Sequence, residues 1–311
     1  MGDGSTVVVA GASGDLGGRI VRALHERGAH VRAIVRRGGD ATRLAGLRTL
    51  GVEVAEVEYG DAAGLARACA RGACVVSALS GLRPVIVDAQ VALLDAAVAA
   101  GVPRFVPSDY CIDYTTLPRG TNRNLDLRAE FRERLDAAPV AATSVLNGMF
   151  ADLLTGPAPV VLFPLRRVVY WEDADQPLDF TTIDDTTAVT AEAALDPSAP
   201  RFLRIAGEEI SARGLASAAS EATGQRFRLL RAGGLGRLGL LITIARTVAP
   251  GRGETFPPWQ GMQYLRDMFS GRAKLAPLDN ARYPERQWTS VREVLAAHRA
   301  ALASGVDRAA A

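Results

Sequence analysis

Lysine is almost absent from this sequence of 311 residues. The chain has 36 lysine and arginine residues, and Lys274 is the only lysine among them. A mechanism that needs a primary amine must therefore use this one side chain. The many arginines have a simple explanation in coding bias, so an arginine in a notable position needs a further argument before it is given a role.

Cysteine and histidine are also scarce. The cysteines are Cys69, Cys74 and Cys111, and the histidines are His25, His30 and His298. An odd number of cysteines without paired spacing predicts reduced, unlinked thiols in an intracellular protein. The cysteines and histidines do not have the spacing of metal ligands, so we predict no metal site.

The charge is nearly balanced, at +2 from 36 basic and 34 acidic residues. Because no basic run of the nucleic-acid-binding type occurs, we expect no nucleic-acid partner. The longest apolar helix candidate, residues 235–250, is short and contains Arg237 and Arg246, which argues against a membrane span. The first residues lead directly into a strand without a signal-peptide pattern, so we expect a cytoplasmic protein with no membrane partner.

The first half of the chain contains a regular alternation of apolar strands and amphipathic helices. Residues 6–12, TVVVAGA, are a continuous apolar run typical of a strand buried on both faces. Residues 16–28 follow with apolar side chains at helical spacing, and the unit then repeats. This pattern predicts an α/β fold with a doubly wound parallel (Rossmann) sheet. The further strands expected are 30–37, 52–61, 73–80, 104–110 and 141–150, and the further helices are 62–72, 84–101 and one that begins near 123.

The second half is less regular, and we expect it to form a smaller substrate lobe. The division predicted is a nucleotide-binding domain over 1–154 and a C-terminal lobe over 155–311. Within the lobe, residues 160–171 suggest a hairpin, and Ser211 is a suitable N-cap for a helix. The last helix is expected to be capped by Thr289 or Ser290.

The motif GASGDLG lies between the first strand and the first helix. Gly11 suits a tight turn, Gly14 allows the backbone to approach a pyrophosphate, and Gly17 permits close packing of the helix. Amide groups at the start of the helix would face the phosphates. In this strand–turn–helix context the motif predicts a dinucleotide site, the alternative being a structural turn without a ligand. The residues expected to bind are Gly11, Ala12, Ser13, Gly14, Asp15, Leu16 and Gly17.

The end of the second strand indicates which dinucleotide is bound. An NAD-specific chain usually has an acidic residue there, which binds the ribose hydroxyls. This chain has Arg36 and Arg37 instead, and a guanidinium suits a 2′-phosphate. We therefore favour NADP(H). Asp61, after the third strand, has two equally suitable roles, as an acceptor for the adenine amino group or as the N-cap of the next helix.

These motifs together resemble the NmrA-like branch of the atypical short-chain dehydrogenases/reductases, which includes isoflavone reductases and phenylcoumaran benzylic ether reductases. The matching stretches are GASGDLG, AIVRR, YGD, VVSALS, VPRFVPSDY and AATSVLNGMF. The resemblance implies that residues after the fourth and fifth strands line the nicotinamide and its ribose, with Asn147 near the substrate end. It also implies that residues at about 178–207 return to the main sheet. The lining residues implied are Ala78, Leu79, Ser80, Pro107 and Ser108.

The chain departs from this family at the position of its catalytic lysine. The resemblance implies a lysine in the helix after PSDY, but the nearest residue in register is Arg128. Arginine stays protonated near neutral pH, so it transfers protons poorly. It can still orient a carbonyl and stabilise negative charge. A proton would then come from Tyr110, from Tyr114 or from water.

Two functions follow from these observations. The first is an NADPH-dependent oxidoreductase that transfers hydride to a polarised C=O or C=C bond of a small apolar substrate, with Arg128 and either Tyr110 or Tyr114 as catalytic residues. The second is a regulator that binds NADP(H) without turnover and acts through a protein partner. The missing lysine favours the regulator, whereas the polar and aromatic residues at the strand ends favour the enzyme, which we prefer.

Overall fold

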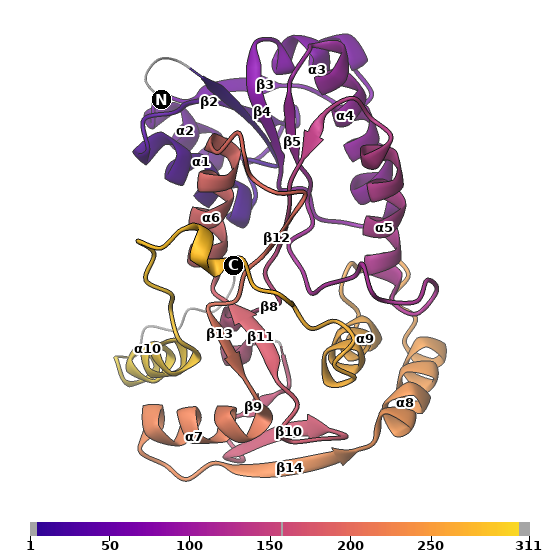
Figure 1. Cartoon of the computed structure of the whole chain (residues 1–311), viewed down its shortest axis with the longest axis vertical. Helices are drawn as coiled ribbons and strands as arrows, with labels where there is room; N and C mark the ends of the chain where they lie inside the picture. The colour runs from indigo at the N-terminus through magenta and orange to yellow at the C-terminus, as the bar shows by residue number, and fades with distance from the viewer. Residues whose placement is uncertain (1–4, 157, 305–311) are drawn as a thin grey trace. The chain divides into compact units, whose positions relative to one another are not determined.

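The computed structural model describes residues 5–156 and 158–304 (Figure 1). The chain divides into two compact units, each assembled from several segments. The first unit contains Met1–Asp109, Asn124–Val145 and Thr186–Leu203. The second unit contains Tyr110–Arg123, Leu146–Asp185 and Arg204–Ala311. Among the described residues, no helix is both long and apolar enough to cross a membrane.

A six-stranded parallel sheet forms the centre of the first unit, in the order β3-β2-β1-β4-β5-β6. This is the doubly wound arrangement that the alternating pattern predicted, and the strand order reverses next to β1. The carboxyl ends of β1 and β4 are therefore neighbours at one edge. The strands are β1 (Thr6–Ala10), β2 (His30–Val35), β3 (Glu53–Glu56), β4 (Gly72–Ser77), β5 (Arg104–Val106) and β6 (Ala141–Ala142).

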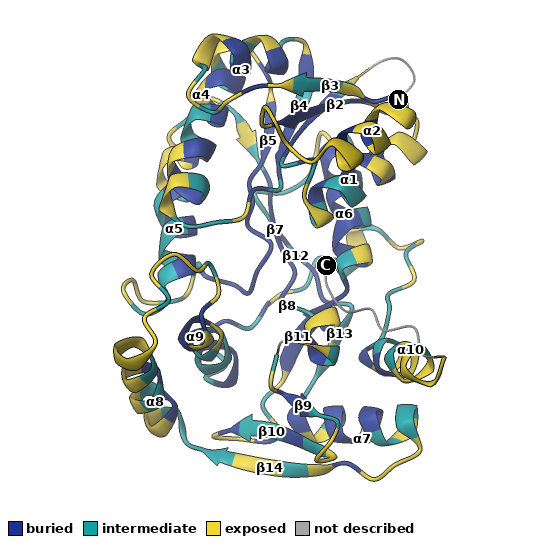
Figure 2. Cartoon of the chain, turned by 180° about the vertical axis from the view of Figure 1, so that it is seen from behind, coloured by how far each residue is buried: buried dark blue, intermediate teal, exposed yellow. Residues whose placement is uncertain are grey.

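The helices of this unit pack apolar side chains against the sheet, and Figure 2 shows the central strands β1, β4 and β5 as mostly buried, whereas the edge strand β3 is partly exposed. Phe105 of β5 and Phe131 of α5 lie in one core with Val8, Leu65 and Leu93. The expected helix at 84–101 is a π-helical turn, η1 (Pro84–Ala89), that continues into α4 (Gln90–Ala99). The other helices are α1 (Asp15–Glu26), α2 (Ala41–Thr49), α3 (Ala62–Cys69), α5 (Arg123–Asp136) and α6 (Ile183–Leu195).

The single strand expected at 141–150 is wrong, because this segment is divided among three sheets. β6 pairs with β5, β7 (Ser144–Leu146) pairs with β12 (Phe202–Arg204), and β8 (Met149–Phe150) pairs with β11 (Leu178–Thr181). Gly148 causes the last break, with φ at +68°. A Cβ atom there would lie 2.3 Å from the carbonyl oxygen of Asp179, so only glycine fits this approach.

The expected return of residues 178–207 to the main sheet also needs correction. β11 pairs with β8 and with β13 (Glu208–Ile210) in a separate three-stranded sheet. Only the part from Thr186 to Leu203, which includes most of α6, belongs to the first unit. A strand and the helix that follows it are therefore assigned to different units.

In the rest of the second unit, the predicted hairpin and the two predicted helix caps are present. β9 (Val161–Leu162) and β10 (Arg167–Trp171) form the expected antiparallel hairpin, and β14 (Arg228–Gly233) joins β10. Ser211 caps α7 (Ala212–Thr223) and Ser290, rather than Thr289, caps α10 (Val291–Ala303). The other helical segments are η2 (Ala151–Thr155), α8 (Leu235–Val248), α9 (Pro258–Phe269) and η3 (Asn280–Arg282).

Candidate functional site

The turn after β1 brings the glycine motif against the end of β4. Gly11 has φ at +77°, and a Cβ atom there would lie 2.7 Å from the carbonyl oxygen of Ala78. A Cβ atom on Gly17 would lie 2.1 Å from the carbonyl oxygen of Gly11. Both positions therefore require glycine, since any side chain would push the turn away from the sheet. The roles expected for these two glycines agree with this geometry.

The start of α1 has the geometry of an anion site. Gly14 is the N-cap residue, and within the described residues no side chain caps this end of the helix. The positive end of the helix dipole lies at Gly14 and Asp15, which are both exposed. The amide of Gly14 donates to the carbonyl of Gly11 over 2.9 Å, which closes the turn. An anion at this end would meet the amides of the first helical turn, which have no partner within the helix.

Two arginines from different elements lie near this turn. Arg43, in the helix α2 that the sequence pattern did not predict, donates to the carbonyl oxygen of Ser13 over 2.6 Å. Arg36, directly after β2, is exposed and forms no ion pair with any residue that the structure describes. Arg43 also lies 3.7 Å from the carboxylate of Asp40. Its contact with the glycine turn is one that the sequence reasoning missed.

Arg37 and Asp61 are engaged with each other and with the backbone. Asp61 caps α3, accepting from the amide of Gly64 over 2.8 Å, and its carboxylate lies 3.8 Å from the Arg37 guanidinium. Of the two roles open to Asp61, the structure thus contains the cap. Burial raises the pKa of the neighbouring Tyr59 phenol, and the positive charge of Arg36 acts against this rise. Tyr59 is therefore a neutral group beside Arg36.

The loops after β4 and β5 are joined by Ser108, which is held in turn by the buried Gln90. The hydroxyl of Ser108 donates to the carbonyl oxygen of Leu79 over 2.6 Å, and its amide donates to Oε1 of Gln90 over 3.0 Å. Gln90 is fully buried and donates to the carbonyl of Ile86 over 2.7 Å. It lies where the π-helical turn becomes α4, and such turns are often found at functional sites. A glutamine within the apolar stretch PVIVDAQVALL was the available signal for this role.

Arg128 lies on the buried face of α5. Its side chain is almost wholly buried, with 8% of the residue exposed, and Nη1 donates to the carbonyl oxygen of Asn124 over 3.2 Å. A guanidinium held away from water interacts strongly with nearby charge because the local dielectric constant is low. Arg128 belongs to the first unit, whereas Tyr110 and Tyr114, both buried, belong to the second.

Asn147 is also in the second unit, and its backbone organises the strand ends there. Its amide donates to the carbonyl of Cys111 over 3.0 Å, and its carbonyl accepts from the hydroxyl of Thr181 over 2.7 Å. Asn147 is completely buried. These contacts hold the segment that follows Tyr110 beside the end of β11.

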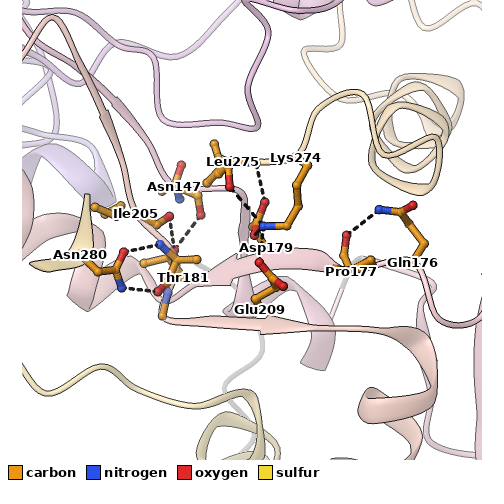
Figure 3. A network of polar contacts seen from close by, with 12 residues as sticks. Asn147, Gln176, Pro177, Asp179, Thr181, Ile205, Glu209, Lys274, Leu275 and Asn280 are labelled. Atoms are coloured by element: carbon orange, nitrogen blue, oxygen red, sulfur yellow. Dashed lines mark hydrogen bonds and ion pairs between the residues drawn. The ribbon is translucent and has the colours of Figure 1, made fainter. Parts of the chain in front are cut away.

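The only lysine of the chain is held between two carboxylates of the same unit (Figure 3). Lys274 forms ion pairs with Asp179 of β11 and with Glu209 of β13, which face each other across the two strands. Asp179 also accepts from the amide of Leu275 over 2.8 Å. Burial acts to lower the pKa of Lys274, but the bonds to the two carboxylates outweigh it and raise this pKa. Burial raises the pKa of Asp179. Lys274 is therefore a charged ammonium group and does not act as a base near neutral pH.

The Lys274 segment packs against the segment that contains the two tyrosines. The amide of Asp113 donates to the carbonyl of Ala273 over 3.2 Å, and the hydroxyl of Thr116 donates to the carbonyl of Arg272 over 2.5 Å. A small pocket lies at this junction. It is lined by Ile112, Leu178, Asp179, Met268 and Lys274, with Pro177 and Ala273. Its volume is about 10 Å³, and its lining combines five apolar residues with the ion pair of Asp179 and Lys274.

Comparisons with known proteins agree with this architecture. The model of the NmrA-like family matches residues 3–233. No curated protein matches the chain. A structure of AtPrR2 with NADP+ and (+)pinoresinol is 22% identical with a TM-score of 0.79, covering 96% of this chain and 100% of that one. An isoflavone reductase is 20% identical with a TM-score of 0.79, covering 94% and 99%. A leucoanthocyanidin reductase–NADPH complex from Vitis vinifera is 16% identical with a TM-score of 0.80, covering 95% and 100%.

Proposed function

The chain belongs to the NmrA-like family, and from this membership and its glycine turn we propose that it is an NADPH-dependent oxidoreductase. In this proposal it transfers hydride to a polarised C=O or C=C bond of a small apolar organic molecule. The observation that carries the proposal is the turn at Gly11 and Gly17, where a Cβ atom would clash with backbone. A turn so tightly packed, followed by the first turn of a helix that no described side chain caps, fits a pyrophosphate.

The choice of NADP(H) over NAD(H) rests on the basic residues around this turn. Arg36 is exposed at the end of β2 where an NAD-binding chain would have an acid, and Arg43 reaches the carbonyl of Ser13. Two of the similar structures were solved with NADP+ or NADPH. We assign the 2′-phosphate to Arg36 and, secondarily, to Arg43.

The residues of the chain would supply orientation and charge, since bound NADPH supplies the hydride. Arg128 would hold the carbonyl or enone oxygen and stabilise the negative charge that develops on it. This role needs a fixed cation and no proton transfer, which suits a buried guanidinium. Tyr110 or Tyr114 would donate the proton, with water as the alternative donor.

The substrate class is proposed from the similar structures and not from the small pocket at Ile112 and Met268, which at about 10 Å³ cannot hold an organic molecule. The similar structures include a pinoresinol complex and an isoflavone reductase, whose names indicate aromatic compounds.

The cofactor assignment is tested by calorimetry with Arg36→Ala. We expect this change to weaken NADPH binding by about tenfold to a hundredfold, the value of one charge-assisted phosphate contact, and to leave NADH binding unchanged. Arg22→Ala, which removes another exposed arginine of the same unit, is the matched control and is expected to have no effect. Equal weakening of both cofactors would contradict the assignment.

The reaction is tested with purified protein, NADPH and a panel of quinones, enones and aldehydes. Turnover by the natural chain, lost in Arg128→Ala and retained in part in Arg128→Lys, is the expected result because a cation at this position is required. NADPH binding should be unaffected in both variants. Turnover that survives Arg128→Ala would remove Arg128 from the mechanism.

A non-catalytic regulator is the second candidate, and the state of Lys274 favours it. Lys274 is the only lysine that could take the place of the family's catalytic lysine, and it forms ion pairs with Asp179 and Glu209. The chain therefore has no neutral lysine amine that could act as a catalytic base. A regulator would show no turnover on the whole panel and would bind NADPH and NADP+ with very different affinity. A protein partner would then be the route by which it acts.

A further inference from the structure

Helix α8 of the second unit presents a line of apolar side chains to solvent. Leu240, Ile244 and Val248 are four residues apart, so they share one face of the helix, and they are 60%, 49% and 79% exposed. Leu238 and Ile242 occupy the opposite, buried face. Figure 2 shows most of α8 as exposed. We call Leu240, Ile244 and Val248 the α8 stripe.

The chain around the α8 stripe is basic and has no acidic residue of its own. Residues 222–253 contain six arginines and no aspartate or glutamate. All six are at least partly exposed: Arg226, Arg228, Arg231, Arg237, Arg246 and Arg252. Arg246 lies over the ring of Trp259, at 5.2 Å from the ring centroid. Arg237 lies on the exposed face of α8, one turn before Leu240. Glu172, directly after β10, accepts a hydrogen bond from the amide of Leu235 at the start of α8.

We propose that this surface docks reversibly on a membrane rich in anionic phospholipids. A basic helix with an exposed apolar stripe is the pattern of a helix that lies in the plane of the bilayer surface. The α8 stripe would enter the boundary of the acyl chains, and the arginines would bind headgroup phosphates, for which the planar guanidinium is well suited. Helix α8 has 14 residues, too few to span the bilayer, so it would lie at the surface and not cross it.

The charges favour a lipid surface over two other occupants. A second copy docked through α8 would bring together twelve exposed arginines from the two 222–253 segments, with no acidic residue in either segment to neutralise them. A nucleic acid would satisfy the arginines, but it would leave the aliphatic stripe in water. Of these three, an anionic bilayer offers negative charge and an apolar layer at the same surface.

Vesicle sedimentation with the full chain tests this proposal. We expect the protein to sediment with phosphatidylglycerol vesicles at low ionic strength, to remain in solution with phosphatidylcholine vesicles, and to be released by salt. Leu240→Ser with Ile244→Ser should lower the fraction bound at least tenfold, because two aliphatic anchors are lost. Arg231→Gln with Arg237→Gln should weaken binding and reduce its salt dependence.

The matched control removes the same kinds of side chain from another exposed helix. Leu302→Ser with Arg292→Gln on α10 should leave vesicle binding unchanged, and circular dichroism should show that all variants are folded. Absence of binding to phosphatidylglycerol at low salt, or equal binding to both lipids, would overturn the proposal. A dimer in sedimentation velocity that the α8 double variant dissociates, without vesicle binding, would assign the surface to a second copy instead.

Discussion

Lys274 is the only lysine of the chain, and its ion pairs with Asp179 and Glu209 give it a structural role. It is 20% exposed, and its partner Asp179 is only 4% exposed. Replacing Lys274 with methionine would leave the buried carboxylate of Asp179 with the amide of Leu275 but without a counter-charge. We expect Lys274→Met to lower the free energy of unfolding by about 2 to 4 kcal/mol. Urea unfolding followed by circular dichroism measures this loss.

A double-mutant cycle separates the ion pair from the packing of the lysine side chain. Asp179→Asn removes the buried charge, so Lys274→Met should cost much less in the presence of Asp179→Asn than alone. Additive losses would show that the charges are not coupled. Because NADPH binding is assigned to the other unit, the NADPH affinity of both variants should match that of the natural chain.

The three cysteines allow a test of burial. All three are buried thiols, as the sequence predicted of unlinked cysteines. Burial raises the pKa of the Cys69 thiol to about 11 and that of Cys74 to about 12. Both are therefore protonated at pH 8, and the thiol is a poor nucleophile compared with the thiolate.

We expect the folded protein to resist iodoacetamide at Cys69 and Cys74 at pH 8, and the unfolded protein in urea to react rapidly. Mass spectrometry of peptides locates the modification and gives its rate. Rapid alkylation of either residue in the folded protein would contradict the burial of these strands and helices.

At the scale of an element, α10 begins with a complete capping box. The amide of Glu293 donates to the hydroxyl of Ser290 over 3.2 Å, and the amide of Ser290 donates to the Glu293 carboxylate over 2.7 Å. We expect Ser290→Ala to lower the free energy of unfolding by about 1 kcal/mol. Thermal unfolding measures the change, and Ser304→Ala at the other end of the helix is the control.

The same capping box makes a prediction about pH. The hydrogen bonds from Ser290 hold the pKa of Glu293 below its ordinary value. A depressed carboxyl pKa contributes stability above the unfolded pKa, and this contribution is lost as the pH falls through the folded pKa. The cost of Ser290→Ala should therefore be larger at pH 7 than at pH 3. An equal cost at both would show that Glu293 does not take part.

At the scale of the whole molecule, the chain passes repeatedly between its two units. The first unit is completed by Thr186–Leu203, which follows 40 residues of the second unit, Leu146–Asp185. Arg27 of α1 forms an ion pair with Glu192 of α6 at 3.0 Å, and Arg104 of β5 donates to the carbonyl of Ala194 over 3.3 Å. A fragment that ends at residue 154 lacks these partners of the nucleotide-binding sheet.

We therefore expect a fragment of residues 1–154 to unfold without cooperativity and to bind NADPH much more weakly than the full chain, because the surfaces that α6 covers would be exposed. Circular dichroism and calorimetry test this. Cooperative unfolding of the fragment with full NADPH affinity would support the simple boundary near 154 that the sequence suggested.

Local patterns account for what the sequence by itself determined. The apolar strands, the amphipathic helices and the glycine turn each depend on residues within a few positions of one another, so periodicity and turn chemistry identified them. The cap at Ser211 and the hairpin of β9 and β10 were predicted for the same reason. Helix α2 was missed because only Leu44 and Leu47 are buried in it, too few for a clear pattern.

The tertiary structure decided the features that depend on distant residues. Arg43 meets Ser13, Gln90 meets Ser108, and Lys274 meets Asp179, pairs separated by 30, 18 and 95 residues. No local period encodes such contacts. These contacts form because the order of the strands in a sheet brings distant segments of the chain together. They also form because the chain passes from one sheet to another at glycines such as Gly148. The local sequence pattern thus identified the glycine turn that is typical of the family. Which side chains surround this turn was determined by tertiary packing alone.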